Sequence, residues 1–212
     1  MEIKNLLFIV CIGLFTQKAK AQTPAIDSLQ QLEAVEKSLE KKAFLLYDII
    51  DLQSEIDTGI AYTTLRTVKN LVKENRYLLA FAPFYEGQIV WMSDSVKTKQ
   101  LYQRSIQLLS GYKTPKALQI TARAWHNYGI FLQMSGRQGE FTDILLNKVI
   151  PVSKKIDDKI SVASAYNAVG TVYSNKEDYQ TALNYFKQAI EYVQLDKRSI
   201  KKMMVLADAS IS

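Results

Sequence analysis

The chain has 212 residues, of which 48% are hydrophobic and 23% are charged, and its formal net charge is +6. This composition is typical of a folded protein and excludes a chain that is disordered along its whole length. The charge is mild, and we interpret the one dense basic run, at residues 197–202, as the solvated start of a helix. We therefore expect no nucleic-acid partner.

The first 21 residues have the three parts of an export signal. Lys4 supplies positive charge, residues 6–15 form a mostly apolar run, and the sequence Ala-Lys-Ala at residues 19–21 is the small-x-small pattern that a signal peptidase reads. The apolar run is too short for the ~20 residues that a membrane helix needs. We therefore predict a signal peptide at residues 1–21, cleaved after Ala21, and a bacterial protein that is periplasmic or secreted.

Cysteine and histidine are too scarce for the usual metal sites. Cys11 is the only cysteine and lies inside the predicted signal, and His126 is the only histidine. This excludes a histidine or cysteine ligand cluster, and it excludes disulfides within the mature chain. The sequence also has no nucleophile elbow, phosphate loop or dinucleotide fingerprint. We expect a protein that is not an enzyme and that carries neither cofactor nor metal.

Residues 22–56 are predicted to form one long helix, or two helices with a break near Glu40. Asp27 is predicted to be the N-cap. Apolar residues recur on one stripe at helical spacing over the first half of this segment, at Leu29, Leu32, Val35 and Leu39.

Residues 57–212 are predicted to form helical hairpins joined by short polar turns. Helices are expected at residues 60–72 and 96–109, and between them an apolar, aromatic stretch at residues 77–92 contains Pro83. Proline cannot donate a backbone hydrogen bond, so we expect Pro83 to bend this helix or to start a new one.

The next hairpin is expected to begin at Thr114, which can cap a helix with Pro115 at its first position. That helix is predicted to run to about Ser135. Its partner is predicted at residues 141–150, and it is expected to end at Pro151 or in the segment at residues 156–158.

The clearest pattern lies at residues 163–195, where two helical stripes flank a polar turn at residues 175–178. Gly170 and Ala182 are small enough to let the two helices approach closely. The pattern resembles a tetratricopeptide repeat, a helix-turn-helix unit of about 34 residues. When Gly170 is aligned with the repeat glycine, six residues fall on the other signature positions: Tyr166, Val169, Tyr173, Ala182, Phe186 and Ala189. Gln194 stands where the family has a closing proline.

A longer period supports the same interpretation. Gly87, Gly129 and Gly170 follow one another at two nearly equal intervals. Trp125 and Gly129 take the first-helix signature positions of the preceding repeat. This step is similar to the extended repeats, of about 40 residues, in bacterial regulators. We predict an all-α fold, a tetratricopeptide-like array of antiparallel helical hairpins that forms a short α-solenoid. The alternative is a helical bundle without repeat symmetry.

The end of the chain continues the pattern. Residues 198–211 are amphipathic, and one further step equal to that from Gly129 to Gly170 reaches Ile211. We interpret this segment as the first helix of an incomplete last repeat. Either it caps the array, or the chain is cut short from a longer protein.

The resemblance also implies a site, because the first helices of these repeats line a concave groove that holds a partner peptide. We expect a protein or peptide partner, bound partly by apolar contact. For each of the groove candidates taken singly, the alternative role is an ordinary surface residue or a packing contact between repeats, and this alternative explains the residue equally well. The groove candidates are Phe84, Gln88, Trp91, Arg123, His126, Ile130, Gln133, Asn167, Thr171 and Ser174.

The sequence thus predicts an exported, non-enzymatic scaffold for protein–protein interaction. The alternative is the sensory, periplasmic region of a truncated bacterial signalling or transcription-regulator protein. Its membrane helix and output domain would lie beyond Ser212.

Overall fold

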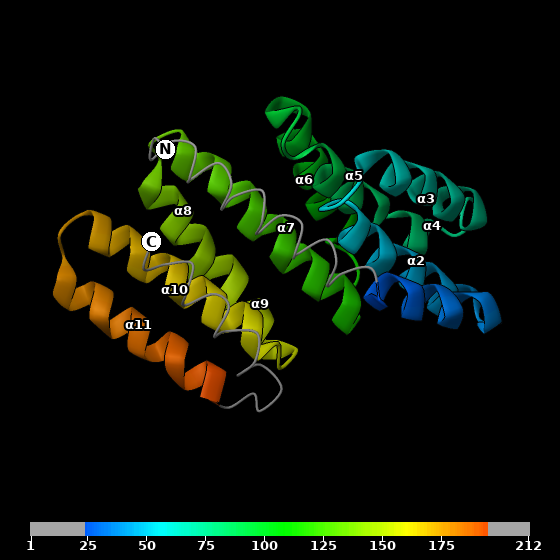
Figure 1. The fold of residues 1–212 in the computed structure, drawn as a ribbon. Helices are drawn as coiled ribbons and strands as arrows, with labels where there is room; N and C mark the ends of the chain where they lie inside the picture. The colour runs from blue at the N-terminus through cyan, green and yellow to red at the C-terminus, as the bar shows by residue number, and fades with distance from the viewer. Residues whose placement is uncertain (1–23, 195–212) are drawn as a thin grey trace, which may run out of the picture. The chain divides into compact units, whose positions relative to one another are not determined.

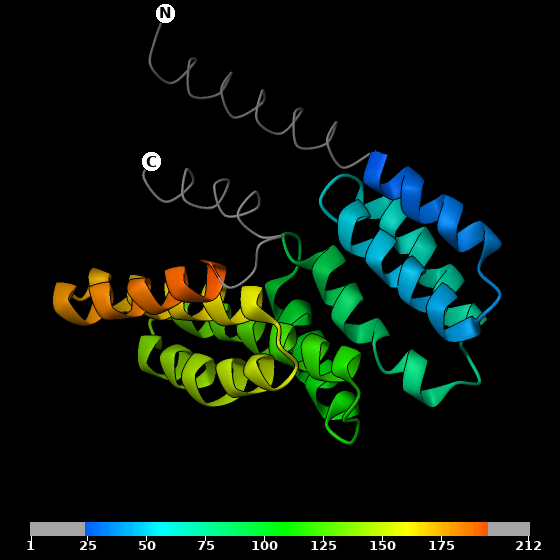
Figure 2. The same ribbon diagram turned by 90° about the horizontal axis from the view of Figure 1, so that it is seen from below.

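The computed structural model describes residues 24–194, and every regular element in that range is helical (Figures 1 and 2). The all-α prediction is therefore confirmed. The predicted signal peptide at residues 1–21 and the predicted helix at residues 198–211 lie outside the described residues.

Two compact units make up the chain, Met1–Leu101 and Tyr102–Ser212. The boundary falls inside helix α6 (Ser95–Leu109). The sequence analysis separates an N-terminal helix or helix pair at residues 22–56 from the predicted repeats at residues 57–212. In the structure, the helices on either side of that point pack against each other within the first unit.

The N-terminal unit is built from short antiparallel helices. A helix at residues 24–35 is followed by a break at residues 36–38, so two helices form where the sequence left one or two open. Asp27 lies inside the first of these helices, and its predicted role as N-cap is wrong. The remaining helices of this unit before α6 are α2 (Leu39–Gln53), α3 (Thr58–Leu71), α4 (Arg76–Leu79) and α5 (Ala82–Val90).

Side-chain caps fix the starts of these helices. Ser38 accepts a hydrogen bond from the backbone N–H of Lys41, and Asp57 accepts from the N–H groups of Gly59 and Ile60. Such caps satisfy donors that the first turn of a helix leaves unpaired. Pro83 lies in the first turn of α5, where its missing N–H costs nothing, so the prediction that it starts a new helix is confirmed.

Aromatic side chains form the core of the N-terminal unit. The rings of Tyr47 on α2 and Tyr85 on α5 stack with centroids 4.6 Å apart, and both residues are fully buried. The Tyr47 hydroxyl donates to the carbonyl of Leu78 at 2.9 Å. Burial raises the pKa of Tyr47 above its ordinary value, so the phenol stays protonated and keeps this hydrogen bond.

The C-terminal unit contains the two hairpins that the sequence predicted most clearly. Thr114 accepts from the N–H of Ala117, and Pro115 is the first residue of α7, as expected. The elements after α6 are α7 (Pro115–Met134), α8 (Gln138–Ile144), η1 (Leu145–Val149), α9 (Ile150–Lys155), α10 (Lys159–Asn175) and α11 (Tyr179–Gln194).

The helix after α7 ends at the second of the two places that the sequence allowed, the segment at residues 156–158, and not at Pro151. It continues as α9 to Lys155, after a π-helical turn, η1, that directly precedes the proline region. A proline ring clashes with the carbonyl four residues earlier in a regular α-helix. The wider π turn offers a way around that clash, and the helix ends only at Ile156.

Close helix contacts at two glycines define the hairpins. A Cβ atom on Gly170 would lie 2.6 Å from a ring carbon of Phe186, and one on Gly129 would lie 2.6 Å from a ring carbon of Phe141. These distances are shorter than real Cβ contacts, so a side chain at either glycine would require the phenylalanine ring to shift. The step that relates Gly129 to Gly170 relates Phe141 to Ala182 and not to Phe186. The phenylalanine that contacts the glycine therefore comes from a different repeat position in the first hairpin than in the second.

Candidate partner-binding face

The structure places the signature residues of the second hairpin between α10 and α11. Tyr166, Val169 and Gly170 on α10 are buried, and so are Ala182 and Ala189 on α11. Tyr173 and Phe186 are half-buried at the same contact. These residues therefore hold the hairpin together and leave the other faces of α10 for other contacts.

Four tyrosines extend this contact. The ring of Tyr185 stacks on Tyr166 and on Tyr173, with centroids 6.1 and 5.6 Å away, and Tyr192 lies 5.8 Å from Tyr166. Lys154 on α9 donates to the Tyr166 hydroxyl at 3.0 Å, and this hydrogen bond helps to raise the pKa of Lys154. The cluster ties α9, α10 and α11 together, which is a structural role.

The predicted groove residues on α10 face away from that contact. Asn167 and Thr171 are exposed, and Ser174 is half-buried, whereas their neighbours Tyr166 and Gly170 are buried. Spacings of four and three residues place the three polar side chains on one side of the helix. The side presented there is neutral and carries amide and hydroxyl groups.

The predicted residues on α7 are more enclosed. Arg123, His126, Ile130 and Gln133 are all half-buried. Ile130 packs against a core cluster that includes residues of α8, η1 and α10. The His126 ring lies 6.1 Å from the ring of Phe141, and burial lowers its pKa to about 4, so it is neutral at pH 7. Helices α7 and α10 contact one another, which brings the two sets to neighbouring helices.

Charge is distributed unevenly over the described part of the C-terminal unit. Helices α7 and α10 contain Lys116, Arg123 and Lys159 but neither aspartate nor glutamate. The acidic residues between positions 102 and 194 lie on α8, on α11 and in the turns. Helices α7 and α10 therefore contribute positive charge and no carboxylate of their own, and Lys159 at the start of α10 pairs with the Asp157 carboxylate at 3.4 Å.

The three remaining predicted residues belong to the N-terminal unit. Phe84 is fully buried and contacts the Tyr85 ring, so its side chain is part of the core and its predicted surface role is corrected. The Gln88 amide donates to the Asp51 carboxylate at 3.3 Å, and Trp91 is half-buried. We therefore restrict the candidate face to α7 and α10.

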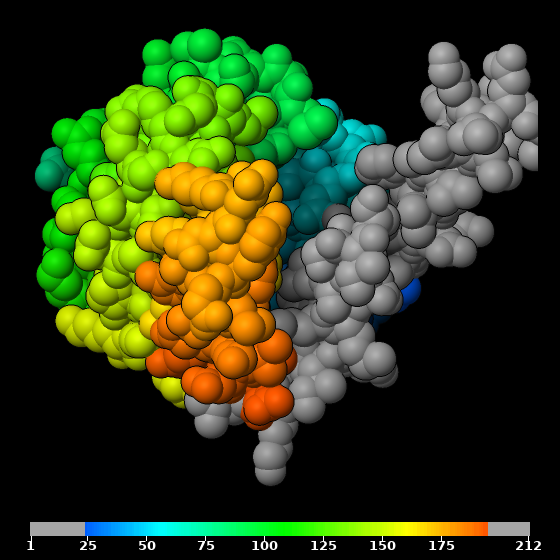
Figure 3. All heavy atoms as spheres, turned by 90° about the vertical axis from the view of Figure 1, so that its left-hand side faces the viewer, coloured from blue at the N-terminus to red at the C-terminus, as the bar shows by residue number. Residues whose placement is uncertain are grey.

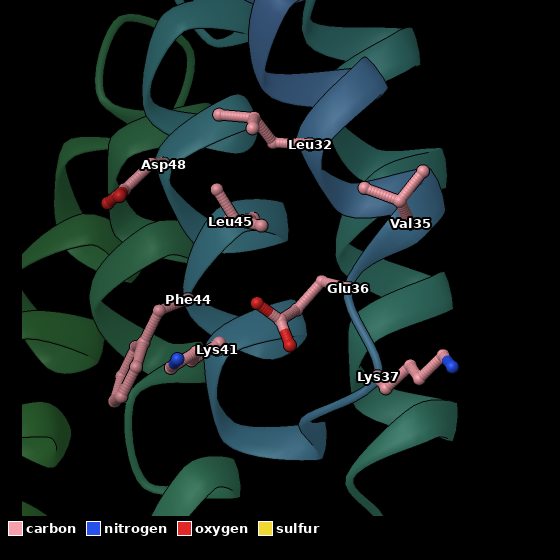
Figure 4. Close-up of a pocket in the computed structure, with 8 residues that line it drawn as sticks. All are labelled: Leu32, Val35, Glu36, Lys37, Lys41, Phe44, Leu45 and Asp48. Carbon is pink, nitrogen blue, oxygen red and sulfur yellow. The ribbon is translucent and has the colours of Figure 1, made fainter.

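A cleft that the sequence did not indicate lies between the helix at residues 24–35 and α2 (Figure 4). Its volume is about 630 Å³. Leu32 and Leu45 point toward one another across it, while Lys37 points away (Figure 4). The predicted apolar stripe is partly solvent-exposed here, since Val35 is 74% exposed. The lining residues are Leu32, Val35, Glu36, Lys37, Lys41, Phe44, Leu45 and Asp48.

Mixed charge at this cleft gives no clear ligand preference. Lys37 and Lys41 stand beside Glu36 and Asp48. Between residues 24 and 194, no group of three or more histidine, cysteine, aspartate or glutamate side chains could hold a metal ion. In the same range, none of the helices has both the length and the apolar character required to cross a membrane.

The second hairpin has two features: its helices pack tightly at Gly170, and its first helix has a polar, exposed side. Both features are typical of helical-hairpin repeat proteins. Residues 120–194 match the family described as Tetratricopeptide repeat, so the predicted resemblance to this family is confirmed over that range. The match covers α7 almost from its start and ends with α11. Repeats of this family are protein–protein interaction scaffolds and are generally not catalytic.

Comparison with solved structures finds matches of low sequence identity. One described as "Crystal structure of MamA" has a TM-score of 0.48 and 20% sequence identity, and the similarity covers 81% of this chain and 88% of that one. A second, "Crystal structure of MamA protein", has a TM-score of 0.46 and 19% identity, with 86% and 91% covered. No curated protein sequence matches the chain.

Proposed function

We propose that this protein is a non-enzymatic scaffold that holds a peptide or protein segment along α7 and α10. The observation that carries this proposal is the exposure of Asn167 and Thr171 on α10, next to signature residues that are buried. The tetratricopeptide repeat match over residues 120–194 supports it, because the first helices of such repeats form the binding face.

The chemistry of α7 and α10 favours a neutral or acidic partner segment. Amide and hydroxyl groups on α10 can donate to and accept from a peptide backbone. Arg123 and Lys116 on α7 are positively charged and attract carboxylates, and neither α7 nor α10 contains an acidic side chain that would repel them. Lys159 on α10 is already paired with Asp157. Ile130 offers a limited apolar contact beside them.

Site-specific photocrosslinking in the source cells tests this proposal. A photoreactive amino acid replaces Thr171 on the candidate face, and in a matched control it replaces Asn184, which is exposed on α11. We expect a discrete crosslinked protein from position 171 and none from position 184.

Added negative charge on the exposed side of α10 tests the same face in a second way. The double variant Asn167→Glu, Thr171→Glu should abolish the crosslink from a probe at Ser174 while the protein keeps its thermal midpoint, because both replaced side chains are exposed. A crosslinked partner that persists in this variant, or that appears equally from position 184, would place binding elsewhere.

We further propose that the protein is exported, as a periplasmic or secreted protein. Support comes from the charge, the apolar run and the small-x-small pattern within residues 1–21. An exported location would give the scaffold a partner among proteins of the bacterial envelope or its surroundings.

A further inference from the structure

An apolar surface is exposed in the N-terminal unit, at the cleft between the helix at residues 24–35 and α2 (Figure 4). Leu32 is 56% exposed and Val35 is 74% exposed. Leu45 on α2 is half-buried and points toward Leu32 across the cleft. Large apolar side chains that gather on a surface in this way mark a place of contact with another molecule.

The charged residues on α2 are arranged symmetrically about this apolar surface. Lys41 lies about one turn before the pair Phe44 and Leu45, and Asp48 lies about one turn after it. Spacings of three, four and seven residues place the four side chains on one stripe of the helix. Lys41 and Asp48 therefore lie roughly 5 Å along the helix on either side of the midpoint between Phe44 and Leu45.

Such a stripe is complementary to itself when the direction of the helix is reversed. A two-fold axis at right angles to α2, between positions 44 and 45, places Lys41 opposite the partner's Asp48. Phe44 and Leu45 then face the same pair of the second copy. Leu32 lies across the cleft from Leu45, so it is near the same axis and meets the partner's Leu32. The mixed charge gives no preference for a ligand of one sign, but it suits an interface between two copies.

We propose that this surface joins two copies of the chain. The helix at residues 24–35 and α2 pack antiparallel on the same two helices of the second copy, with Leu32, Phe44 and Leu45 at the centre. A pair between Lys41 and the partner's Asp48 closes the contact at each end. Another partner would have to carry both charges at the matching spacing, whereas a second copy supplies them by symmetry.

This contact is distinct from the proposed binding face on α7 and α10, and it goes beyond that function. A dimer carries two such faces, one on each copy. A partner with two binding segments would therefore bind the dimer more tightly than a single chain.

Charge exchange between positions 41 and 48 tests the antiparallel pairing. Sedimentation equilibrium of the purified protein should give twice the mass of one chain. Lys41→Asp or Asp48→Lys alone places like charges opposite each other, and each should raise the dissociation constant of the dimer by about tenfold or more. The double variant should restore the dimer. Positions 41 and 48 are roughly 10 Å apart along one helix, so a contact within the chain does not explain this rescue.

Lys37→Asp is the matched control for the charge change. It alters the net charge as Lys41→Asp does, but the Lys37 side chain points away from the cleft (Figure 4). The control should leave the dissociation constant unchanged. Far-UV circular dichroism checks that each variant remains helical.

Replacement of an exposed leucine tests the apolar centre. Leu32→Asp should give the mass of one chain, because it places two carboxylates together on the axis. Leu183→Asp is the matched control, since Leu183 is 47% exposed on α11, the orange helix on the surface that faces the viewer in Figure 3. This control should remain a dimer.

A single cysteine on the axis identifies the second copy directly. In a Cys11→Ser background the chain has no other cysteine, so Leu32→Cys adds one defined thiol. Mild oxidation should give a disulfide between two chains, and Lys37→Cys in the same background should give none.

Four results would overturn the proposal. A mass of one chain at every concentration tested would exclude the dimer. A dimer that persists in both Leu32→Asp and Lys41→Asp would assign association to another surface. A helical double variant that associates no better than the single variants would exclude the antiparallel pairing. A monomer whose thermal midpoint falls sharply in Leu32→Asp would show that another part of the same chain covers the surface.

Discussion

Gly170 lies where α11 packs tightly against α10. The ring of Phe186 occupies the space where a side chain on Gly170 would begin. Gly139 on α8 provides the contrast, because a Cβ atom there would meet nothing within 4 Å. The two glycines are both helical, so a comparison between them separates packing from helix propensity.

Gly170→Leu should lower the free energy of unfolding by about 1–3 kcal/mol, because the added side chain displaces the Phe186 ring. The same substitution at Gly139 should change it by less than about 1 kcal/mol, the scale of helix propensity alone. Urea denaturation of both variants measures the difference. Equal effects at the two positions would mean that Gly170 is not at a helix crossing.

His126 should report its own environment, since it is the only histidine in the chain. Its half-buried ring near Phe141 has a pKa lowered from 6.5 to about 4 by burial. The proton resonances of the imidazole can be followed by NMR without overlap from another histidine. A titration midpoint near the ordinary value would show instead that the ring is solvated.

This pKa shift makes stability depend on pH with a defined sign. Between pH 6.5 and 4 the unfolded state binds a proton at His126 and the folded state does not. The histidine therefore contributes its full stabilisation above pH 6.5, and this is lost as pH falls toward 4. The loss is on the order of 1–3 kcal/mol for this partly buried ring. Comparison of the protein with His126→Gln by urea denaturation at pH 7 and pH 5 isolates this contribution, because all carboxylates are common to both.

Helix ends in this protein are fixed by single side chains, as the start of α10 shows. Asp158 accepts hydrogen bonds from the N–H of Ser161 at 3.1 Å and from its hydroxyl at 2.8 Å. Asp157 before it has a φ of 55° and lies outside the helix. The sequence indicated only that a helix could end at residues 156–158, and the structure shows that Asp158 is also the cap of the next helix.

Asp158→Ala should lower the free energy of unfolding by about 1 kcal/mol, the usual cost of a lost N-cap. Asp157→Asn should have little effect, because asparagine tolerates the left-handed conformation and the ion pair with Lys159 is at the surface. Thermal or urea unfolding measures both. A loss at Asp157 as large as at Asp158 would contradict this assignment of the cap.

At the scale of the whole molecule, export has a direct chemical signature. Purification from the cell envelope or the medium should yield a chain whose first residue is Gln22, because cleavage is predicted after Ala21. Intact-mass spectrometry and N-terminal sequencing measure this. Ala21→Asp should block cleavage and leave the larger precursor, whereas a full-length chain from the unmutated gene would contradict the prediction.

The sequence by itself determined the helical class, the turn at residues 175–178 and the close approach at Gly170. Those features depend on local spacing and on residue size, which can be read along the chain. It also predicted the polar residues of α10, because helical spacing separates Asn167 and Thr171 from their buried neighbours. The use of these residues in binding stays a prediction.

Whether a given side chain is buried or exposed depends on the packing of helices that are distant in the sequence, and this packing is visible only in the three-dimensional structure. Phe84 fits a groove by its position in the repeat, yet the aromatic core of the N-terminal unit buries it. Pro151 and the segment at residues 156–158 are both possible helix ends in the sequence, and the structure selects the second, because the π turn η1 precedes the proline and the helix continues to Ile156. Tyr179 and Ile190 are large apolar residues on α11, yet they are 66% and 54% exposed. Burial depends on what packs against a face, and spacing along one helix does not contain that information.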